Sequence, residues 1–491
     1  MITNVNELDL KIESAHAAYE AARNVAPEER ANWLSAIARN LEDHASELVA
    51  LAAKETHLAE PRLRGELART TFQLRLFASE IANGDHFSAT VDHKDDGWGM
   101  GPRPDIRRVN VPLGVVGVFG ASNFPFAFSV MGGDSASALA AGCAVVHKVH
   151  EGHFQLGLRT SQIVVQALAS VSAPSGLFSA VSGREAGERL VDHPLIKAIG
   201  FTGSTSGGRA LFDRACRRPE PIPFFGELGS INPVFVTEKA WTLRRDIILS
   251  EYVDSFTLSM GQFCTKPGIL FAPTADRGEL LEVLRRSLDG KSSAPLLNER
   301  LREGFDKSFS KVSTMAGVTT LIPGGGKSVS LPAVLITTTD MIRRRPKLLR
   351  EEMFGPATLI VQYERGENLV HLAEMFEGQL TSSVHAEPDE DLTDLVGVLR
   401  DRSGRLLWNA WPTGVTVTYA QHHGGPYPAT TASGATAVGT AAIGRFMRPV
   451  AFDSFPASHL PPALKDDNPW GIRRRVDGRW VNPTETHGVT E

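Results

Sequence analysis

Between residues 113 and 236, short apolar runs alternate with helical segments, and this alternation constrains the fold more than any other feature of the sequence. An alternation of this kind favours parallel strands joined by crossover helices. The expected fold class is therefore α/β, with a doubly wound sheet whose ligands bind beyond the carboxyl ends of its strands. The runs expected to form strands are residues 115–119, 144–148, 177–181, 196–201 and 232–236.

The segments on either side of this alternation predict further parts of the molecule. Helical spacing of apolar residues predicts helices over 7–24, 27–56 and 61–83, and the polar stretch 84–105 predicts a loop or hairpin. A second α/β set begins near Ala240, with strands expected at 269–272, 333–336 and 357–362. A chain of 491 residues is expected to divide into two or three domains.

Composition argues against several classes of protein. The net charge of −5 and the lack of a long Lys/Arg stripe do not favour nucleic acid or an anionic membrane. Three cysteines in so long a chain do not make a disulfide framework and suit a reducing cytosol, so a cytoplasmic location is expected. The N-terminus lacks the pattern of a secretory signal, and the most apolar stretch, 115–146, is broken by polar residues, proline and glycines.

Two residues have surroundings suited to covalent chemistry. Cys264 lies in segment 261–268, where a helix gives way to a loop, and thiolate is the reactive form of cysteine. Glu227 lies between apolar residues just before a strand, so its carboxylate needs a partner or has a raised pKa suited to a general base. Taken alone, a buried structural cysteine and a salt-bridged glutamate are the commoner interpretations.

Two further segments follow expected strands. The side-chain amide of Asn123, after the strand ending at Phe119, can stabilise an oxyanion, although an asparagine in a turn before proline is the commoner case. Residues 203–208 combine a strand end with a Gly/Ser-rich helix start, whose free N–H groups suit a pyrophosphate. The alternative for 203–208 is a simple helix N-cap.

Taken together, and in their order along the chain, the four segments resemble the aldehyde dehydrogenase superfamily, and segment 351–356 also matches a motif of that family. The resemblance implies a doubly wound cofactor domain, an α/β catalytic domain and a small oligomerisation element. It implies that Cys264 is the nucleophile, Asn123 the oxyanion-hole amide and Glu227 the general base. The implied reaction forms a thioester on Cys264, which water activated by Glu227 then hydrolyses.

The resemblance also implies a nicotinamide cofactor and residues that hold it: Lys148 and Glu151 at the adenosine ribose, Gly203, Ser204 and Gly208 at the pyrophosphate, and Glu352 and Phe354 at the nicotinamide end. A carboxylate at position 151 would repel a 2′-phosphate, so NAD is favoured and NADP is the alternative.

Segments 120–129, 261–268, 425–431 and 438–442 resemble one branch of the family. That branch contains 2-oxoglutarate semialdehyde (2,5-dioxopentanoate) dehydrogenases, which we favour, and an NADP-linked fatty aldehyde dehydrogenase, which is the alternative. A substrate carboxylate needs a cation near the pocket, and the sequence leaves open whether Arg159, Arg445 or Arg448 supplies it.

The sequence departs from the family at two places. Ser122 stands where many relatives carry tryptophan, and Pro267-Gly268 replaces an arginine often found after the nucleophile. Two rival classes remain: a catalytically silent family member, and a cysteine hydrolase, which would need a histidine base that no motif identifies.

Two other patterns are expected to carry no function. His147, His150 and His153 straddle a strand end, so alternating strand geometry would not direct them at one ion, and we expect no metal. Segment 324–327 resembles part of a phosphate loop but lacks its leading glycine, so a solvated turn is expected.

The expected domains are a cofactor domain (1–86 and 112–229), a catalytic domain (230–425) and an oligomerisation element (87–111 and 426–491). The site is expected between the two large domains. A homodimer or homotetramer is expected, because a strand donated across subunits would join them.

Overall fold

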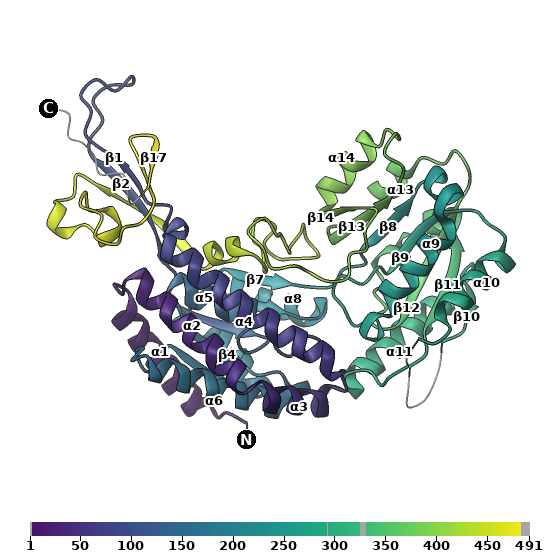
Figure 1. The fold of residues 1–491 in the computed structure, drawn as a ribbon, viewed down its shortest axis with the longest axis horizontal. Coiled ribbons are helices and arrows are strands. Elements are labelled where there is room, and N and C mark those ends of the chain that lie inside the picture. The colour runs from purple at the N-terminus through teal and green to yellow at the C-terminus, as the bar shows by residue number, and fades with distance from the viewer. Residues whose placement is uncertain (1, 292, 325–329, 483–491) are drawn as a thin grey trace.

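The computed structural model describes residues 2–291, 293–324 and 330–482, which form three β-sheets with helices around them (Figure 1). The chain begins with four helices: α1 (Val5–Ala22), α2 (Pro27–Asp43), α3 (Ala45–Thr56) and α4 (Glu60–Asn83). The single helix expected over 27–56 is interrupted at His44, whose ring nitrogen Nδ1 lies 2.8 Å from the Asn40 carbonyl oxygen of the last turn of α2. Gly84, with φ +78°, ends α4.

The first sheet contains five parallel strands in the order β5-β4-β3-β6-β7. The order reverses between β3 and β6, so the crevice where such sheets bind ligands lies at the carboxyl ends of these two strands. Its strands are β3 (Val115–Phe119), β4 (Ala144–Lys148), β5 (Phe178–Val181), β6 (Ile196–Thr202) and β7 (Phe224–Glu227). Its helices are α5 (Gly133–Ala141), α6 (Phe154–Ser170), α7 (Arg184–Asp192) and α8 (Thr205–Cys216).

The second sheet contains seven strands in the order β10-β11-β12-β9-β8-β13-β14 and forms the other lobe of the molecule (Figure 1). All neighbours are parallel except β10 and β11. Its strands are β8 (Pro233–Val236), β9 (Ile269–Pro273), β10 (Thr319–Ile322), β11 (Ala333–Thr338), β12 (Ala357–Tyr363), β13 (Gln379–His385) and β14 (Ser403–Trp408). Its helices are α9 (Glu238–Thr257), α10 (Arg277–Leu288), α11 (Glu299–Ser313), α12 (Thr339–Arg344), α13 (Leu369–Glu374) and α14 (Thr393–Arg402).

The third sheet projects from the body as an arm, in the order β15-β2-β1-β16-β17 (Figure 1). The stretch expected as a loop or hairpin supplies β1, which pairs antiparallel with β2. Several large apolar side chains of the arm are exposed, among them Trp98, Met100 and Trp480. The arm strands are β1 (Thr90–Asp92), β2 (Ile106–Pro112), β15 (Met447–Asp453), β16 (Arg474–Val476) and β17 (Arg479–Val481).

Short 3-10 helices connect these elements: η1 (Asp85–Phe87), η2 (Glu151–His153), η3 (Leu258–Gly261), η4 (Pro346–Arg350), η5 (Thr440–Phe446), η6 (Ala457–His459) and η7 (Pro462–Leu464). Strands β3, β9 and β12 are buried along their whole length, as expected for continuous apolar runs in parallel sheets. Among the described residues, no helix is long and apolar enough to cross a membrane. Of the segment resembling a phosphate loop, residues 325–327 lie outside the described part of the chain.

Candidate active site

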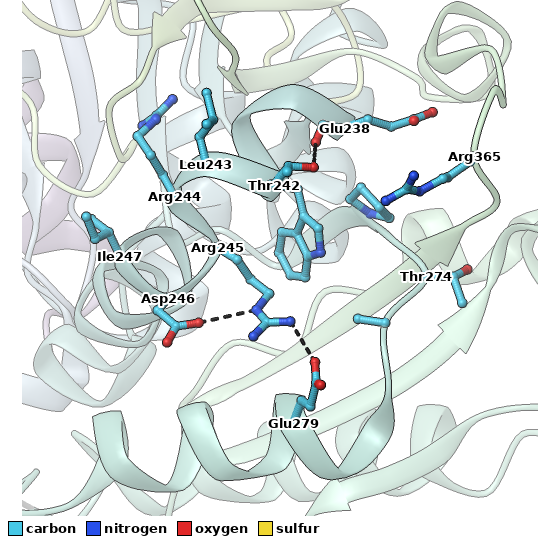
Figure 2. A pocket seen from close by; sticks show the side chains of 13 residues that line it. Glu238, Thr242, Leu243, Arg244, Arg245, Asp246, Ile247, Thr274, Glu279 and Arg365 are labelled. Carbon is cyan, nitrogen blue, oxygen red and sulfur yellow. Dashed lines mark hydrogen bonds and ion pairs between the residues drawn. The ribbon is translucent and has the colours of Figure 1, made fainter.

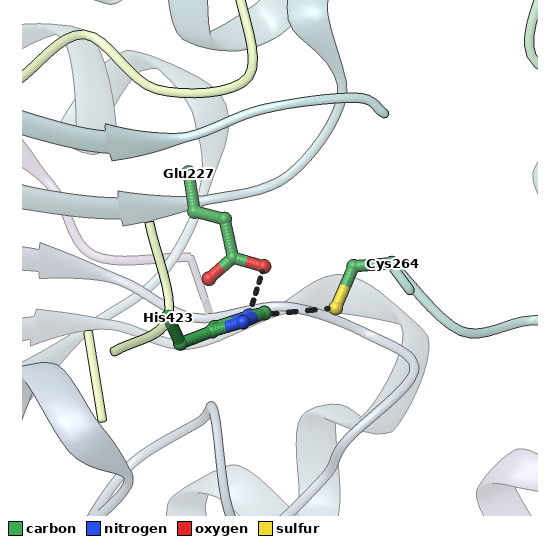
Figure 3. Close-up of side chains that lie close together, drawn as sticks. All are labelled: Glu227, Cys264 and His423. Carbon is green, nitrogen blue, oxygen red and sulfur yellow. Dashed lines mark hydrogen bonds and ion pairs between the residues drawn. The ribbon is translucent and has the colours of Figure 1, made fainter. Parts of the chain in front are cut away.

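Three buried or partly buried side chains from distant parts of the chain meet between the two lobes (Figure 3). Cys264 lies on the loop after α9 and η3, Glu227 is the last residue of β7, and His423 lies between β14 and β15. The Nε2 atom of His423 is 3.7 Å from Sγ of Cys264 and 2.8 Å from Oε1 of Glu227. The structure therefore brings together two side chains that the sequence singled out, and adds a third.

Sequence reasoning missed His423. Its partners Cys264 and Glu227 lie 159 and 196 residues away along the chain, so no local pattern marks it. In the sequence, the lack of an identifiable histidine base argued against a cysteine hydrolase. The structure shows a histidine beside the thiol, so that argument against a hydrolase no longer holds.

The pKa values of Cys264 and Glu227 are shifted in opposite directions. Burial raises the pKa of the Cys264 thiol well above its ordinary value, and the neighbouring Glu227 carboxylate raises it further. Burial acts to raise the pKa of Glu227, but the contacts with His423 and Cys264 and the charge of Arg445 together outweigh it, and the net pKa is lowered. At neutral pH the thiol is therefore protonated and the carboxylate ionised, which is the arrangement of a proton donor beside a base.

Asn123 follows β3 and is 8 % exposed. Its Nδ2 atom donates to the carbonyl oxygen of Gln262 at 3.0 Å, two residues before Cys264. An amide nitrogen carries two hydrogens, so this contact leaves one for a ligand. The side-chain amide is thus held beside the loop that carries the thiol, where an oxyanion hole requires a donor.

The loop that carries Cys264 is fixed by Asn232. Asn232 has a left-handed φ of +55°, and its Nδ2 atom donates to the carbonyl oxygens of Cys264 at 2.8 Å and of Lys266 at 3.0 Å. Its Oδ1 atom accepts hydrogen bonds from the hydroxyls of Ser230 and Thr381. Asparagine tolerates this backbone conformation better than most residues. Asn232 therefore couples the position of the thiol to strands β8 and β13.

The segment that contains Glu352 and Phe354 packs against the same loop. A Cβ atom at Gly261 would lie 2.1 Å from the carbonyl oxygen of Gly355, so only glycine allows this approach. The buried Lys266 donates from Nζ to three backbone carbonyls of the segment, those of Met353, Gly355 and Ala357. Burial raises the pKa of Glu352 to about 7 and lowers that of Lys266 to about 8.

The residues expected at the cofactor lie at the carboxyl edge of the first sheet. Ser204 caps α8 and accepts a hydrogen bond from the Gly207 N–H at 3.3 Å, and the first turn of α8 is exposed. At the end of β4, Nζ of Lys148 lies 3.7 Å from Oε1 of Glu151. An exposed helix N-terminus fits a pyrophosphate, and a lysine at the end of another strand of the same sheet fits a ribose.

Close packing explains two of the glycines in segment 203–208. A Cβ atom at Gly208 would lie 2.2 Å from the Leu228 side chain, and one at Gly203 would lie 2.8 Å from the ring of Phe201. The helix start can therefore approach β6 and β7 only with glycine at these positions.

The three arginines considered for a substrate carboxylate are engaged or distant. Arg159 forms an ion pair with Glu47 on the surface, and Arg445 forms a buried one with Asp134 at 2.6 Å. Arg448 lies in β15 of the arm. A cation for a substrate carboxylate must therefore come from elsewhere.

The histidines considered for a metal do not converge. His147 contacts Ser135, and Nε2 of His153 lies 3.0 Å from the Ala121 carbonyl oxygen. Within the described residues, the group of potential ligands that does converge is Glu227, Cys264 and His423, whose ligand atoms lie within 4.8 Å of one another. Their hydrogen bonds to each other account for this closeness.

A separate surface pocket of about 640 Å³ lies where α9 begins and β9 ends (Figure 2). It is lined largely by charged and polar side chains, and Arg245 within it is paired with Asp246 at 3.2 Å and Glu279 at 2.8 Å. The pocket contains none of the residues that the sequence singled out. It is therefore not the candidate site.

The aldehyde dehydrogenase family profile matches residues 3–427. The chain is 37 % identical to the alpha-ketoglutaric semialdehyde dehydrogenase of Acinetobacter baylyi, over 96 % of this chain and 91 % of that one. It is 39 % identical to alpha-ketoglutaric semialdehyde dehydrogenase 2 of Azospirillum brasilense, with the same coverage. Its fold resembles that of aldehyde dehydrogenase C from Pseudomonas syringae, solved with NAD+ and octanal, with a TM-score of 0.78 and 19 % identity, over 94 % of this chain and 91 % of that one.

Proposed function

Because the chain belongs to the aldehyde dehydrogenase family, we propose that it oxidises 2-oxoglutarate semialdehyde to 2-oxoglutarate with a nicotinamide cofactor. The observation that carries the reaction is the meeting of Cys264 and Glu227 beside the Asn123 amide. The two relatives named for alpha-ketoglutaric semialdehyde, another name for the same compound, support the substrate.

The first half of the reaction begins with a proton transfer between the buried Cys264 and Glu227 side chains. The Cys264 thiol gives its proton to Glu227, with which it shares a hydrogen bond, and the sulfur attacks the aldehyde carbon. The side-chain amide of Asn123 donates to the oxygen that becomes negative. When bound, the nicotinamide cofactor accepts the hydride that leaves this carbon.

The second half releases the acid. The carbon is then held as a thioester on Cys264, and Glu227 removes a proton from the water that attacks it. The C–S bond breaks, the carboxylate departs and the sulfur recovers a proton. Because one carboxylate takes a proton in both halves, Glu227 must return its first proton to solvent before the thioester is hydrolysed.

Seven residues are proposed to hold the cofactor: Lys148 and Glu151 at the adenosine ribose, Gly203, Ser204 and Gly208 at the pyrophosphate, and Glu352 and Phe354 at the nicotinamide end. NAD is proposed over NADP, because the Glu151 carboxylate can bind a ribose diol and repels a 2′-phosphate. A Michaelis constant for NADP equal to or below that for NAD would contradict this preference.

The chain is also proposed to divide into the domains expected above, 1–86 with 112–229, 230–425, and 87–111 with 426–491. The three separate sheets support this division. The exposed apolar side chains of the arm support its role in a homodimer or homotetramer.

A cysteine hydrolase is the second candidate, and the observation that favours it is the 3.7 Å contact between His423 and Cys264. A thiol beside a histidine can attack an ester or thioester with no redox step. Dependence on cofactor separates the two candidates, because the hydrolase would turn over without NAD or NADP.

The test follows the absorbance of reduced nicotinamide with 2-oxoglutarate semialdehyde, using NAD and NADP in parallel. Cys264→Ser is expected to abolish the signal, and Cys216→Ser, at an exposed cysteine, to leave it unchanged. No signal with this substrate but a fast one with a long-chain aldehyde would keep the mechanism and replace the substrate. Ester cleavage without cofactor, and no reduction with any aldehyde, would favour the hydrolase.

A further inference from the structure

Three arginines that the proposed chemistry does not use lie close to the thiol. Arg62 and Arg69 are on α4, and Arg405 is on β14. Arg69 and Arg405 both interact electrostatically with Cys264, and Nη2 of Arg62 donates to the carbonyl oxygen of Asn123 at 2.6 Å. No local sequence pattern identifies these arginines, because their partners are distant in the chain.

Arg69 has an incomplete set of partners. Its Nε atom donates to the Val415 carbonyl oxygen at 3.2 Å, but Nη1 and Nη2 are buried and have no hydrogen-bond partner among the described residues. A guanidinium in this position is costly to bury without an acceptor, and burial lowers the pKa of Arg69. The two free nitrogens form the fork that binds a carboxylate with two parallel hydrogen bonds.

Aromatic rings connect Arg69 to the reacting groups. Its guanidinium lies 5.4 Å from the ring centre of Phe128, which is 5.9 Å from that of His423. His423 in turn contacts Cys264. Phe128 and His423 therefore connect the guanidinium to the thiol through a short chain of contacts.

Arg62 contacts two further aromatic rings near the thiol. Its guanidinium is 5.1 Å from the ring centre of Phe124 and 5.2 Å from that of Phe263, the neighbour of Cys264. Its Nη1 atom is also buried without a hydrogen-bond partner among the residues described. The rings of Phe124, Phe128 and Phe263 contact one another edge to face, with centres 5.4 and 5.0 Å apart. They offer apolar walls to a short carbon chain.

The local charge is positive. Glu66 is a buried carboxylate of α4 that lies 3.9 Å from Arg62. Its Oε1 atom is occupied by the N–H groups of Phe126 and Ala127, and burial raises its pKa, which weakens it as a counterion. Arg405 adds a further positive charge, with both Nη atoms donating to the carbonyls of Pro412 and Gly414. The Glu227 carboxylate also interacts electrostatically with Arg69, so two carboxylates face three guanidinium groups, and one anionic ligand would balance this cluster.

We propose that Arg69, with Arg62 beside it, binds the carboxylate of the substrate and so selects short aldehydes that carry a carboxylate at the far end. The inference rests on the proposed function. In 2-oxoglutarate semialdehyde, four C–C bonds separate the aldehyde carbon from the carboxylate carbon, about 5 Å when extended. The cation must therefore lie close to Cys264, as Arg69 does and the surface residue Arg159 does not. A fatty aldehyde would leave the Arg69 fork without an acceptor.

The experiment compares kcat and KM for 2-oxoglutarate semialdehyde, succinate semialdehyde and uncharged pentanal. Arg69→Met is expected to raise KM for both acids about 10- to 100-fold, the loss of a charged hydrogen bond, while changing their kcat less. The kcat and KM for pentanal are expected to change far less, so the variant loses most of its preference for acids. Arg69→Lys restores part of the affinity, because lysine keeps the charge but not the fork. The matched control is Arg64→Met, since Arg64 lies exposed on the same helix, 3.7 Å from Glu60.

A second readout does not depend on turnover. Glutarate has five carbons and no aldehyde, and it is expected to bind wild-type protein in calorimetry and not Arg69→Met. Equal losses with acids and pentanal, or glutarate binding that survives in Arg69→Met, would overturn the assignment. If the wild-type enzyme oxidises pentanal and the acids equally well, the proposed function stands and the role of Arg69 is refuted. A wild-type protein that oxidises no aldehyde removes the proposed function itself.

Discussion

Replacing His423 with leucine tests how the buried carboxylate of Glu227 is stabilised. Oε1 of Glu227 accepts a hydrogen bond from His423 at 2.8 Å, and its Oε2 atom has no hydrogen-bond partner in the described part of the chain. Leucine removes this donor, so burial of the carboxylate is opposed only by the weaker effects of Cys264 and Arg445. The pKa of Glu227, lowered in the native protein, is then expected to rise above its ordinary value.

The size of the effect is bounded by protonation. An isolated buried carboxylate can always take up a proton, and each pKa unit is worth about 1.4 kcal/mol. From an ordinary pKa of 4.5, staying protonated at pH 7 costs at most about 3 kcal/mol, and at pH 5 about 0.7 kcal/mol. A loss of about 3 kcal/mol corresponds to a fall of about 3 °C in the unfolding midpoint of a chain of this length.

The direction of the pH dependence follows from the pKa of Glu227 in the native protein and in the variant. In the native protein the pKa of the folded Glu227 carboxyl is lowered. The ionised carboxyl therefore stabilises the fold above the unfolded pKa, and this stabilisation is lost as pH falls. In His423→Leu the folded pKa is raised, so the group destabilises the fold as pH rises past the unfolded pKa. The gap in midpoint between the two proteins must therefore widen with pH.

Thermal unfolding of wild type, His423→Leu and His423→Gln near pH 5 and near pH 8 measures this gap. Glutamine keeps an N–H donor close to the position of Nε2, so its gap is expected to be smaller and to depend less on pH. A gap for His423→Leu that stays constant, or that grows toward pH 5, would refute the reasoning.

Two further predictions concern the nucleophile loop and the ligand atoms around it. Lys266→Met removes the three hydrogen bonds that Nζ makes to the carbonyls of Met353, Gly355 and Ala357, which hold the chain at and just after Glu352 and Phe354. The KM for the cofactor should therefore rise about tenfold with little change in KM for the aldehyde; an unchanged cofactor KM in steady-state kinetics would contradict this. Dialysis against a chelator should leave kcat unchanged, whereas added Zn²⁺ should inhibit reversibly, because the ligand atoms at Cys264 lie within 4.8 Å of one another. Activity lost with the chelator and restored by a metal would show that the site needs an ion.

The fold was predictable where burial made the sequence continuous in apolar residues. The strands expected over 115–119 and 144–148 match β3 and β4 to the residue. Strand β13 was missed because Gln379, Thr381, Ser382 and Ser383 read as polar, yet all of them are buried. Thr381 and Ser382 find their hydrogen-bond partners in Asn232 and Ser403, which are distant in the sequence and which no local pattern reveals.

The same limit applied to the site. Cys264, Glu227 and Asn123 stand in segments whose order resembles a family, so they could be named. His423 and Arg69 could not, because each acquires its place through contacts made far along the chain: His423 with Glu227, and Arg69 with the Val415 carbonyl. Arg445 was a candidate by residue type alone, and its buried pairing with Asp134 is visible only in three dimensions.

His423 also explains how Glu227 could serve as a base in a site that keeps the thiol protonated. Burial alone would raise the pKa of both groups and leave neither able to take the other's proton. The imidazole contacts both, but its hydrogen bond to the carboxylate, at 2.8 Å, is far shorter than its 3.7 Å approach to the sulfur. It therefore stabilises the ionised carboxylate more than a thiolate, and the proton rests on sulfur until an electrophile binds. A nucleophile that stays protonated in the absence of aldehyde is also protected from oxidation, since the thiolate is the form that oxidants attack.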